Sequence, residues 1–225
     1  MSTIATPLNP ASSHPVRVDV APALDHRNRL TTAFRLILAI PHLLLVGGPI
    51  AGVVSWSWGS GGNRYDGGVA GGALGAVAAV LTIIAWFAIL FAGQYPKGLW
   101  DLAAYYLRWR VRAVAYTALL RDEYPPFGEG AYPVTVDIQP PVAPRDRLTV
   151  AFRLILIIPH LIAIWALAVA WALVTTIAWF AILFTGRYPA SLYEFSVGAL
   201  RWTTRVEAYL LLLHDEYPPF SLANG

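Results

Sequence analysis

The chain contains no cysteine and few charged residues. Of its 225 residues, 13% are charged and 57% are hydrophobic, and the mean hydropathy is +0.54. The absence of cysteine excludes disulfides, thiolate zinc sites, iron–sulfur clusters and cysteine nucleophiles. A soluble domain carries about 25% charged residues. The shortage of charge therefore predicts an integral membrane protein.

The charge balance argues against a nucleic-acid-binding protein. The formal net charge is only +3, and the basic residues stand beside apolar runs rather than in a basic tail. Basic residues in that position are attracted to an anionic membrane surface. Intrinsic disorder is also excluded, because it requires low hydrophobicity and high charge.

The chain contains an internal repeat. Ile84–Phe91 is identical to Ile177–Phe184, and Asp122–Phe127 is identical to Asp215–Phe220. The segments predicted from this repeat are a disordered N-terminal tail at 1–14, copy one at 15–127, a linker at 128–132, copy two at 133–220 and a C-terminal tail at 221–225. Such self-similarity indicates that one structural unit occurs twice.

Copy one is longer than copy two because of an insertion at about 47–72. The insertion includes the segment Gly59–Gly68, which is rich in glycine and polar residues. This composition predicts a flexible loop. A polar loop belongs at a turn outside the bilayer rather than inside it.

The repeated motifs resemble a known family. Each copy contains Ile-Ala-Trp-Phe-Ala-Ile-Leu-Phe, then Tyr-Pro, then an Arg-Trp-x-x-Arg stretch that begins at Arg108 or Arg201, then Asp-Glu-Tyr-Pro-Pro-Phe. This combination resembles the bacterial membrane-protein family named domain of unknown function 4389, which is often found duplicated. The resemblance implies a membrane protein and brings no activity and no catalytic residues.

The hydrophobic runs allow two topologies. In copy two, the run 148–185 carries one charge, Arg153. As a single helix it would be roughly 57 Å long, against about 30 Å of bilayer hydrocarbon. It is therefore either a hairpin, fully spanning or partly re-entrant, or one long span preceded by an interfacial helix that ends at Pro159.

The charge distribution favours hairpins. Hairpins in both copies would place every Lys and Arg except Arg64 on one side of the membrane, as the positive-inside rule prefers. The predicted transmembrane helices are 30–54, 69–91, 148–164 and 167–184. We expect a multi-pass protein of the bacterial cytoplasmic membrane, with both termini cytoplasmic.

An amphipathic helix is expected after each hairpin. Leu and aromatic residues recur every three or four positions on one face, while the other face carries Arg108 and Arg112 in copy one and Arg201 and Arg205 in copy two. This pattern is typical of helices in the membrane interface. The expected fold class is thus an all-α membrane protein with two tandem repeats, each a transmembrane hairpin followed by an interfacial helix.

Four basic residues at membrane depth are candidate functional residues. Arg35 and His42 are placed to share a helix face, and Arg153 and His160 repeat the arrangement. With no carboxylate between them, they are candidates to receive a lipid phosphate. In the alternative, the two arginines snorkel to the headgroups and the histidines are satisfied by packing. A haem or metal site at the two histidines is the weakest reading, and no metal or cofactor is predicted.

The arginines of the amphipathic helices are the main lipid-headgroup candidates. Arg108, Arg112, Arg201 and Arg205 either contact anionic headgroups or pair with Asp101 and Glu194. The aromatics predicted to lie at the membrane interface are Trp86, Trp179, Tyr95, Tyr188, Trp109 and Trp202. Asp-Glu-Tyr-Pro-Pro-Phe is either a helix terminator or an extended docking peptide.

The sequence contains no catalytic constellation. The leading expectation is a non-enzymatic scaffold or accessory subunit that binds anionic lipid at its cytoplasmic interface. The expected partners are the lipid bilayer and either another membrane protein or a second copy of the chain. A component of a transport system comes second, since internal repeats are common in transporters, and a lipid-modifying membrane enzyme comes third.

Overall fold

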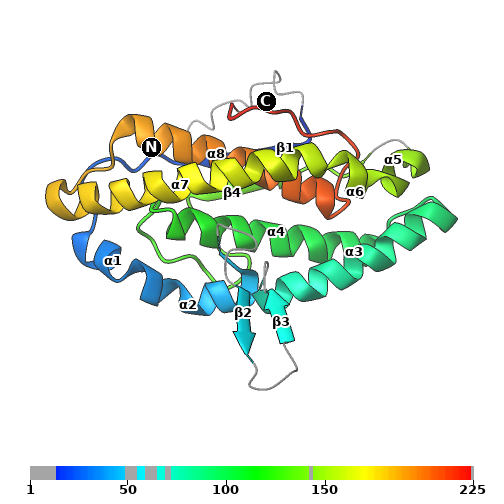
Figure 1. Cartoon of the computed structure of the whole chain (residues 1–225), viewed down its shortest axis with the longest axis horizontal. Helices are drawn as coiled ribbons and strands as arrows, with labels where there is room; N and C mark the ends of the chain where they lie inside the picture. Colours follow the sequence, from blue (N-terminus) through cyan, green and yellow to red (C-terminus); the bar gives the residue numbers. More distant parts are fainter. Residues whose placement is uncertain (1–13, 49–54, 59–64, 69–71, 142–143, 224–225) are drawn as a thin grey trace, which may run out of the picture.

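The computed structural model describes residues 14–48, 55–58, 65–68, 72–141 and 144–223 (Figure 1). Its elements in chain order are β1 Val16–Val20, α1 Arg29–Ala33, α2 Arg35–Val46, β2 Ser55–Trp58, β3 Tyr65–Gly68, α3 Gly72–Ala92, α4 Lys97–Thr117, β4 Val134–Ile138, α5 Arg147–Ala151, α6 Arg153–Leu156, α7 Ile158–Thr185 and α8 Ala190–Leu210. The chain is mostly helical. The predicted tail at 1–14, apart from its last residue, and the tip of the insertion lie outside the described residues.

The expectation of an all-α fold is wrong in one respect, because the described chain also contains two antiparallel ribbons. β1 pairs with β4 from Val16 opposite Ile138 to Val20 opposite Val134, and β2 pairs with β3. In β4 every second residue is buried, as alternation of apolar and polar residues produces in a strand. Asp19 and Asp137 are exposed on the other face. The β1–β4 ribbon joins the two copies into one body.

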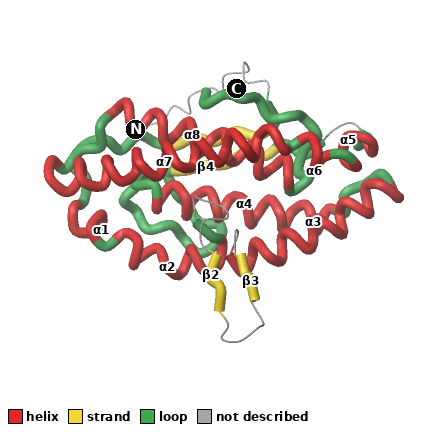
Figure 2. The backbone as a smooth tube through the Cα atoms, viewed as in Figure 1, coloured by secondary structure: helices red, strands yellow, loops and turns green. Residues whose placement is uncertain are grey.

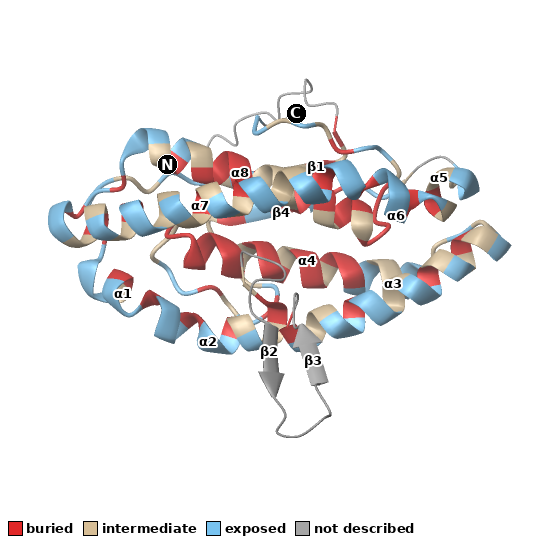
Figure 3. Ribbon diagram, viewed as in Figure 1, coloured by how far each residue is buried: buried red, intermediate tan, exposed pale blue. Residues whose placement is uncertain are grey.

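Helices α4 and α8 form the inner layer of this body. They pack against each other, α4 also packs on α2, α3 and β4, and α8 also packs on α7 and β1. Their aromatic faces are buried, with Tyr106 at 4% and Tyr209 at 0% exposed. The expectation that these faces rest on the bilayer is therefore wrong, because protein covers them (Figure 3).

Helices α1–α3 and α5–α7 form an outer layer, which we call the apolar layer. Helix α1 packs against α7, and α3 packs against α5, so the two sets enclose the inner helices on one side. The β1–β4 ribbon lies behind α7 in the view of Figure 2. Most of the large exposed apolar side chains of the described chain belong to the apolar layer, including Leu36, Phe87, Ile162 and Phe184.

The hairpin predicted for copy two is wrong. The turn was expected between 164 and 167, but α7 runs unbroken from Ile158 to Thr185. Its 28 residues span about 42 Å at 1.5 Å per residue. The two short helices α5 and α6 precede it, which agrees better with the alternative of one long helix after an interfacial segment.

Copy one contains the same long helix in two pieces. Aligned through the repeat, Val46 corresponds to Ile164 and Gly72 to Trp165, which are consecutive in α7. Helices α2 and α3 run in the same general direction and meet at an angle (Figure 1). The insertion therefore interrupts a helix, and the predicted spans 30–54 and 69–91 do not form a hairpin.

Two helices of the described chain are long and apolar enough to cross a membrane. These are Gly72–Ala92 and Ile158–Thr185, with 17% of the most apolar window buried in each. The core helix of a soluble protein would be mostly buried. The low burial shows that both helices leave apolar side chains uncovered by the described chain. Helix α2 is apolar but has only 12 residues, fewer than the roughly 20 that a span requires.

Candidate functional site

Two buried clusters of arginine and aspartate lie at equivalent positions of the two copies. In the first cluster, Nη2 of Arg27 lies 2.8 Å and Nη2 of Arg35 lies 2.6 Å from Oδ1 of Asp122. Both arginine side chains are 1% exposed. The Arg35 guanidinium also lies over the ring of Tyr116, 4.2 Å from its centroid. The Asp122 carboxylate thus balances one of the two buried positive charges.

The second cluster repeats this geometry. Nη2 of Arg153 donates a hydrogen bond to Oδ1 of Asp215 at 2.7 Å, and Nε of Arg145 lies 2.7 Å from Oδ2 of the same carboxylate in an ion pair. The Arg153 guanidinium lies 4.1 Å from the ring centroid of Tyr209. Two arginines and one aspartate leave each cluster with one net positive charge, and a buried charge is costly unless it is paired and hydrogen-bonded.

The ionisation of Asp122 reflects its partners. Burial alone would raise the pKa of this carboxyl group, but hydrogen bonds from Arg27, from the Asn28 backbone N–H and from Arg35 outweigh burial. Together they hold the pKa of Asp122 at about 2. The group is therefore an anion at every physiological pH, which suits a structural counter-ion better than a general acid.

These clusters correct one expectation from the sequence. Arg35 and Arg153 were expected at membrane depth without a carboxylate nearby, either to bind a lipid phosphate or to snorkel to headgroups. Instead each is buried against an aspartate of the Asp-Glu-Tyr-Pro-Pro-Phe segment. Because each guanidinium is paired inside the protein, neither lipid-phosphate binding nor snorkelling is required to satisfy its charge. The segment that was expected to be a helix terminator or a docking peptide is bound within the chain itself.

The same segment encloses a histidine in each copy. The ring of His42 stacks on Phe127, with the centroids 4.5 Å apart. Nε1 of Trp109 donates to His42 Nδ1 at 3.0 Å, and His42 Nε2 lies 3.1 Å from the Pro125 carbonyl oxygen. Since Nδ1 accepts, Nε2 carries the proton and donates. Both ring nitrogens of His42 are therefore occupied, which leaves none for haem or a metal.

The second histidine is enclosed by the equivalent aromatic residues. The ring of His160 stacks on Phe220 at 3.9 Å between centroids, and Trp202 Nε1 donates to His160 Nδ1 at 3.2 Å. Each histidine therefore joins the apolar layer to an inner helix. Among the residues that the structure describes, no group of three or more His, Asp or Glu side chains is placed to hold a metal ion.

The four arginines predicted to contact headgroups have other partners. Arg112 donates to the Gly128 carbonyl oxygen, and Arg205, which is 2% exposed, donates to the carbonyl oxygens of Ser221 and Ala223. Arg201 donates to the Val18 carbonyl oxygen of β1. These bonds fasten chain segments that run beside α4 and α8. Their headgroup role stays a prediction.

Arg108 forms an ion pair and is partly accessible. Its Nη1 lies 3.3 Å from Glu129, and its side chain is 29% exposed. The expected pairing with Asp101 is wrong, because Asp101 pairs with Lys97 at 2.7 Å. Position i+4 on a helix favours this local pair.

The aromatic residues expected at the membrane interface form internal ties. Trp86 Nε1 donates to the Val150 carbonyl oxygen, and Trp179 Nε1 donates to the Thr32 carbonyl oxygen, both at 2.9 Å. Each bond joins one copy to the other at equivalent places. Tyr188, 2% exposed, is held by Ser196. The interface assignment is thus wrong for the buried Tyr188, and it stays a prediction for Trp86 and Trp179, which are half-buried.

Sequence reasoning missed two sets of residues. Asp122 and Asp215 escaped notice because the partner of a buried arginine lies far along the chain. The repeated Arg-x-Arg-Leu-Thr motif marked Arg29 and Arg147, which open α1 and α5, are each followed by a leucine and are exposed. These two arginines stand next to exposed apolar side chains, as headgroup contacts require.

Two further buried histidines come from opposite ends of the chain. His14 and His214 pack edge to face, 5.0 Å between centroids. Burial is the main cause that lowers the pKa of His14 to about 4 and that of His214 to about 3. Nearby positive charges, Arg205 for His14 and Arg153 for His214, add to the effect. Both are therefore neutral at physiological pH.

Comparison with known proteins connects the chain to one family. A family model described as Domain of unknown function (DUF4389) matches residues 67–128 and 147–221. Two matched segments are consistent with a tandem duplication. No curated protein and no solved structure matches the chain.

Proposed function

The chain belongs to the DUF4389 family, and from that premise we propose that it is a non-enzymatic membrane protein that rests in one leaflet, binds anionic lipid and acts as a scaffold or accessory subunit. The observation that carries the proposal is the apolar layer. In its helices α3 and α7, only 17% of the most apolar window is buried in the described chain. An apolar surface of that extent marks a membrane or protein interaction site.

The strand ribbon favours one leaflet over several crossings. β1 precedes α1 and β4 follows α4, yet the two strands pair. Similarly, α8 follows α7 but packs against β1. A single crossing by α2–α3 would place β1 and β4 on opposite sides of the bilayer. A single crossing by α7 would place β1 and α8 on opposite sides. Since neither long helix turns back on itself, we propose that both lie along the membrane.

The polar side of the body fits the same arrangement. The exposed face of the β1–β4 ribbon carries Asp19, Thr135 and Asp137, which would be costly inside hydrocarbon. We propose that this side faces the cytoplasm and that both termini lie there. An amphipathic body of this kind binds through buried apolar area together with attraction to anionic lipids.

Arg29 and Arg147 are the proposed headgroup contacts. They are exposed at the first turns of α1 and α5, next to Leu30 and Leu148, which are 69% and 68% exposed. Each arginine near an anionic surface contributes about 1 kcal/mol. The arginines that are held by backbone carbonyls, such as Arg205, have fewer donors free for lipid.

The scaffold role rests on how the ionisable side chains are used. Asp122, Asp215 and the arginines around them are engaged in internal ion pairs. His42 is engaged on both ring nitrogens. Groups held in this way position chain segments rather than substrates. A membrane protein partner or a second copy of the chain would use the part of the apolar layer that lipid leaves free.

Vesicle flotation tests the lipid proposal. We expect the protein to float with vesicles of phosphatidylglycerol and phosphatidylcholine after detergent removal. The variant Arg29→Gln/Arg147→Gln should bind about thirtyfold less tightly to anionic vesicles at low salt, with the difference shrinking at high salt. Binding to pure phosphatidylcholine vesicles is the control and should not change. Equal anionic binding by the variant would contradict the headgroup assignment.

Cysteine labelling in intact cells tests the topology. Single cysteines at Ser60 and Ser221 should both resist a membrane-impermeant maleimide applied from outside, and both should react after lysis. Labelling at Ser60 alone would show that the chain crosses the membrane before the insertion, and the one-leaflet arrangement would be abandoned.

A further inference from the structure

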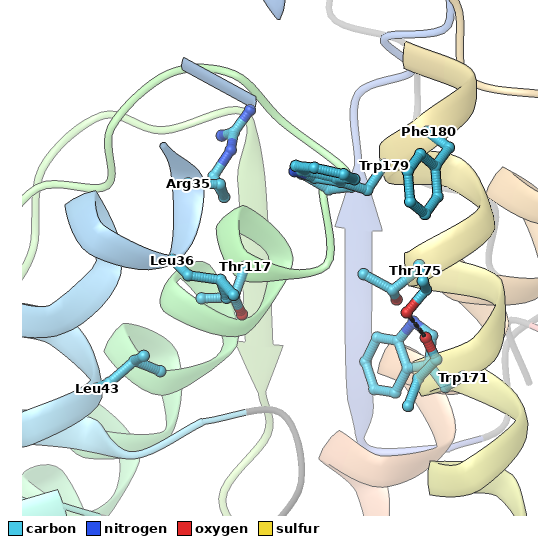
Figure 4. Close-up of a pocket in the computed structure, with 11 residues that line it drawn as sticks. Arg35, Leu36, Leu43, Thr117, Trp171, Thr175, Trp179 and Phe180 are labelled. Carbon is cyan, nitrogen blue, oxygen red and sulfur yellow. Dashed lines mark hydrogen bonds between the residues drawn. The ribbon is translucent and has the colours of Figure 1, made fainter. Parts of the chain in front are cut away.

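A groove of about 480 Å³ opens in the apolar layer between the two copies (Figure 4). Helix α2 forms one wall, helix α7 forms the other, and the end of α4 supplies the floor. The lining residues used below are Arg35, Leu43, Leu119, Trp171, Ala172 and Phe180. The volume falls in the range of small-molecule sites, about 300 to 1,000 Å³.

The walls of the groove are mainly hydrocarbon and aromatic. Leu43 reaches it from α2, Leu119 from the floor, and Phe180 from α7. At one end lies Arg35, whose guanidinium is already bonded to Asp122 and to the Arg121 carbonyl oxygen. The stem of a paired arginine can border hydrocarbon. An apolar chain therefore fits this groove better than a polar metabolite does.

Trp171 supplies one unused hydrogen-bond donor. Its side chain lines the groove from α7 and is 3% exposed. Within the described part of the chain, its Nε1 has no hydrogen-bond partner. A buried indole N–H normally finds an acceptor, and leaving one unpaired costs about 1 to 3 kcal/mol. The free donor therefore points to a ligand that brings an acceptor.

We propose that the groove binds one acyl chain of a membrane phospholipid, whose ester carbonyl accepts the Trp171 N–H. This inference rests on the proposed function, because the groove opens in the layer that we place in the leaflet. Both of its walls carry exposed apolar residues, Leu36 at 70% and Phe180 at 50%. Phospholipid is the apolar species that a leaflet presents at this opening, and its ester is the acceptor nearest to the chain.

The repeat provides a matched pair of variants. Ala172 lines the groove on α7, and Ala79 is the corresponding residue of α3. Ala79 is exposed and is not among the residues that line this groove. Ala172→Phe should fill the groove, whereas Ala79→Phe adds the same side chain elsewhere on the apolar layer. Trp171→Phe removes the N–H and keeps most of the ring.

The test measures bound phospholipid by native mass spectrometry. Each protein is reconstituted in vesicles of phosphatidylglycerol and phosphatidylcholine and extracted with mild detergent. We expect one tightly held phospholipid on the wild type and on Ala79→Phe. The lipid-bound fraction should fall at least fivefold in Ala172→Phe and about threefold in Trp171→Phe. Thermal unfolding followed by circular dichroism identifies any variant that fails to fold.

Two outcomes would overturn the groove proposal. One is equal phospholipid retention by folded Ala172→Phe and the wild type. The other is a wild-type protein that floats with vesicles but retains no phospholipid, which would leave the membrane proposal intact. Failure of the wild type to float, with phospholipid still bound after extraction, would instead overturn the one-leaflet proposal and support the groove.

Discussion

Gly72 lies directly against the backbone of Val46, although residues 47–71 separate the two in the chain. A Cβ atom on Gly72 would stand 2.6 Å from the Val46 nitrogen, and the φ angle of Gly72 is +67°. Only glycine accommodates both conditions without strain. The two ends of the insertion therefore meet. The single helix α7 of copy two corresponds in copy one to two helices, α2 and α3, whose ends are in contact.

This contact predicts that the insertion can be removed. Deletion of 47–71 joins Val46 to Gly72 in the same register as Ile164 and Trp165 in α7, so we expect a folded protein with an unbroken helix. A loop carries little packing, and shortening it costs little entropy. Circular dichroism and thermal unfolding in detergent measure the outcome.

A shifted deletion is the control for helix phase. Deletion of 49–71 leaves two extra residues, which would turn α3 by about 200° relative to α2 at 3.6 residues per turn. That variant should be markedly less stable, because buried Ala85 and Ile89 would rotate out of the core. Equal stability of both deletions would show that the register of copy two is irrelevant to copy one.

The arginine–aspartate clusters predict a large cost for a small substitution. Asp122→Asn removes the carboxylate and leaves Arg27 and Arg35 buried with one hydrogen-bonding amide between them. Breaking a buried pair on one side costs about 3 to 5 kcal/mol, and we expect a loss of about 3 kcal/mol because Asp122 is 24% exposed. Denaturant unfolding in detergent measures the free energy.

Glu123→Gln is the matched control for this substitution. Glu123 is the next residue and pairs with Arg121 while its own side chain is 53% exposed. An exposed pair contributes at most about 1 kcal/mol. If Asp122→Asn and Glu123→Gln cost the same, the cluster would not be a structural ion pair.

The buried histidines predict a loss of stability in mild acid. The pKa values of His14 and His214 in the folded protein, about 4 and about 3, lie below the unfolded value of about 6.5. The unfolded chain therefore binds more protons below pH 6.5, and stability falls as the pH drops from there toward the folded values. Each histidine contributes about 1.4 kcal/mol per pH unit within that window.

Substitution of one histidine isolates this effect. His214→Phe should flatten the stability profile between pH 6.5 and 4.5, a range that stays above the pKa of Asp122. An unaltered slope in His214→Phe would mean that other groups govern the acid response.

The tryptophan ties predict different roles for two residues of α7. Trp179→Phe loses the hydrogen bond to the Thr32 carbonyl oxygen and should cost about 1 kcal/mol of stability. Trp165 is 71% exposed, so Trp165→Phe should leave stability within about 0.5 kcal/mol. The same unfolding measurement compares both. A larger loss in Trp165→Phe would place that residue against protein instead of lipid.

Much of the architecture followed from the sequence. Composition alone indicated a membrane protein, because the chain is rich in hydrophobic residues and poor in charged ones. The matching segments that include Ile84–Phe91 and Asp122–Phe127 indicated the duplication and the family. The helical periodicity located α4 and α8 correctly, because residues three and four apart share a helix face. Helical periodicity and repeated segments can be recognised in the sequence whatever part of the chain packs against them.

What covers each face was decided by the tertiary structure. The aromatic faces of α4 and α8 were read as lipid-facing, yet they pack on protein, and a hydrophobic stripe looks the same in either case. The partners of Arg35 and Arg153 lie far along the chain at Asp122 and Asp215, beyond any local pattern. Pairing of β1 with β4 is likewise a long-range contact, and it opposes a single crossing by α2–α3, while the packing of α8 on β1 opposes a single crossing by α7. The sequence by itself determined which segments are helical and apolar, because periodicity and composition are properties of neighbours in the chain. Which apolar surfaces remain exposed depends on contacts between distant segments, and only the folded chain determines those.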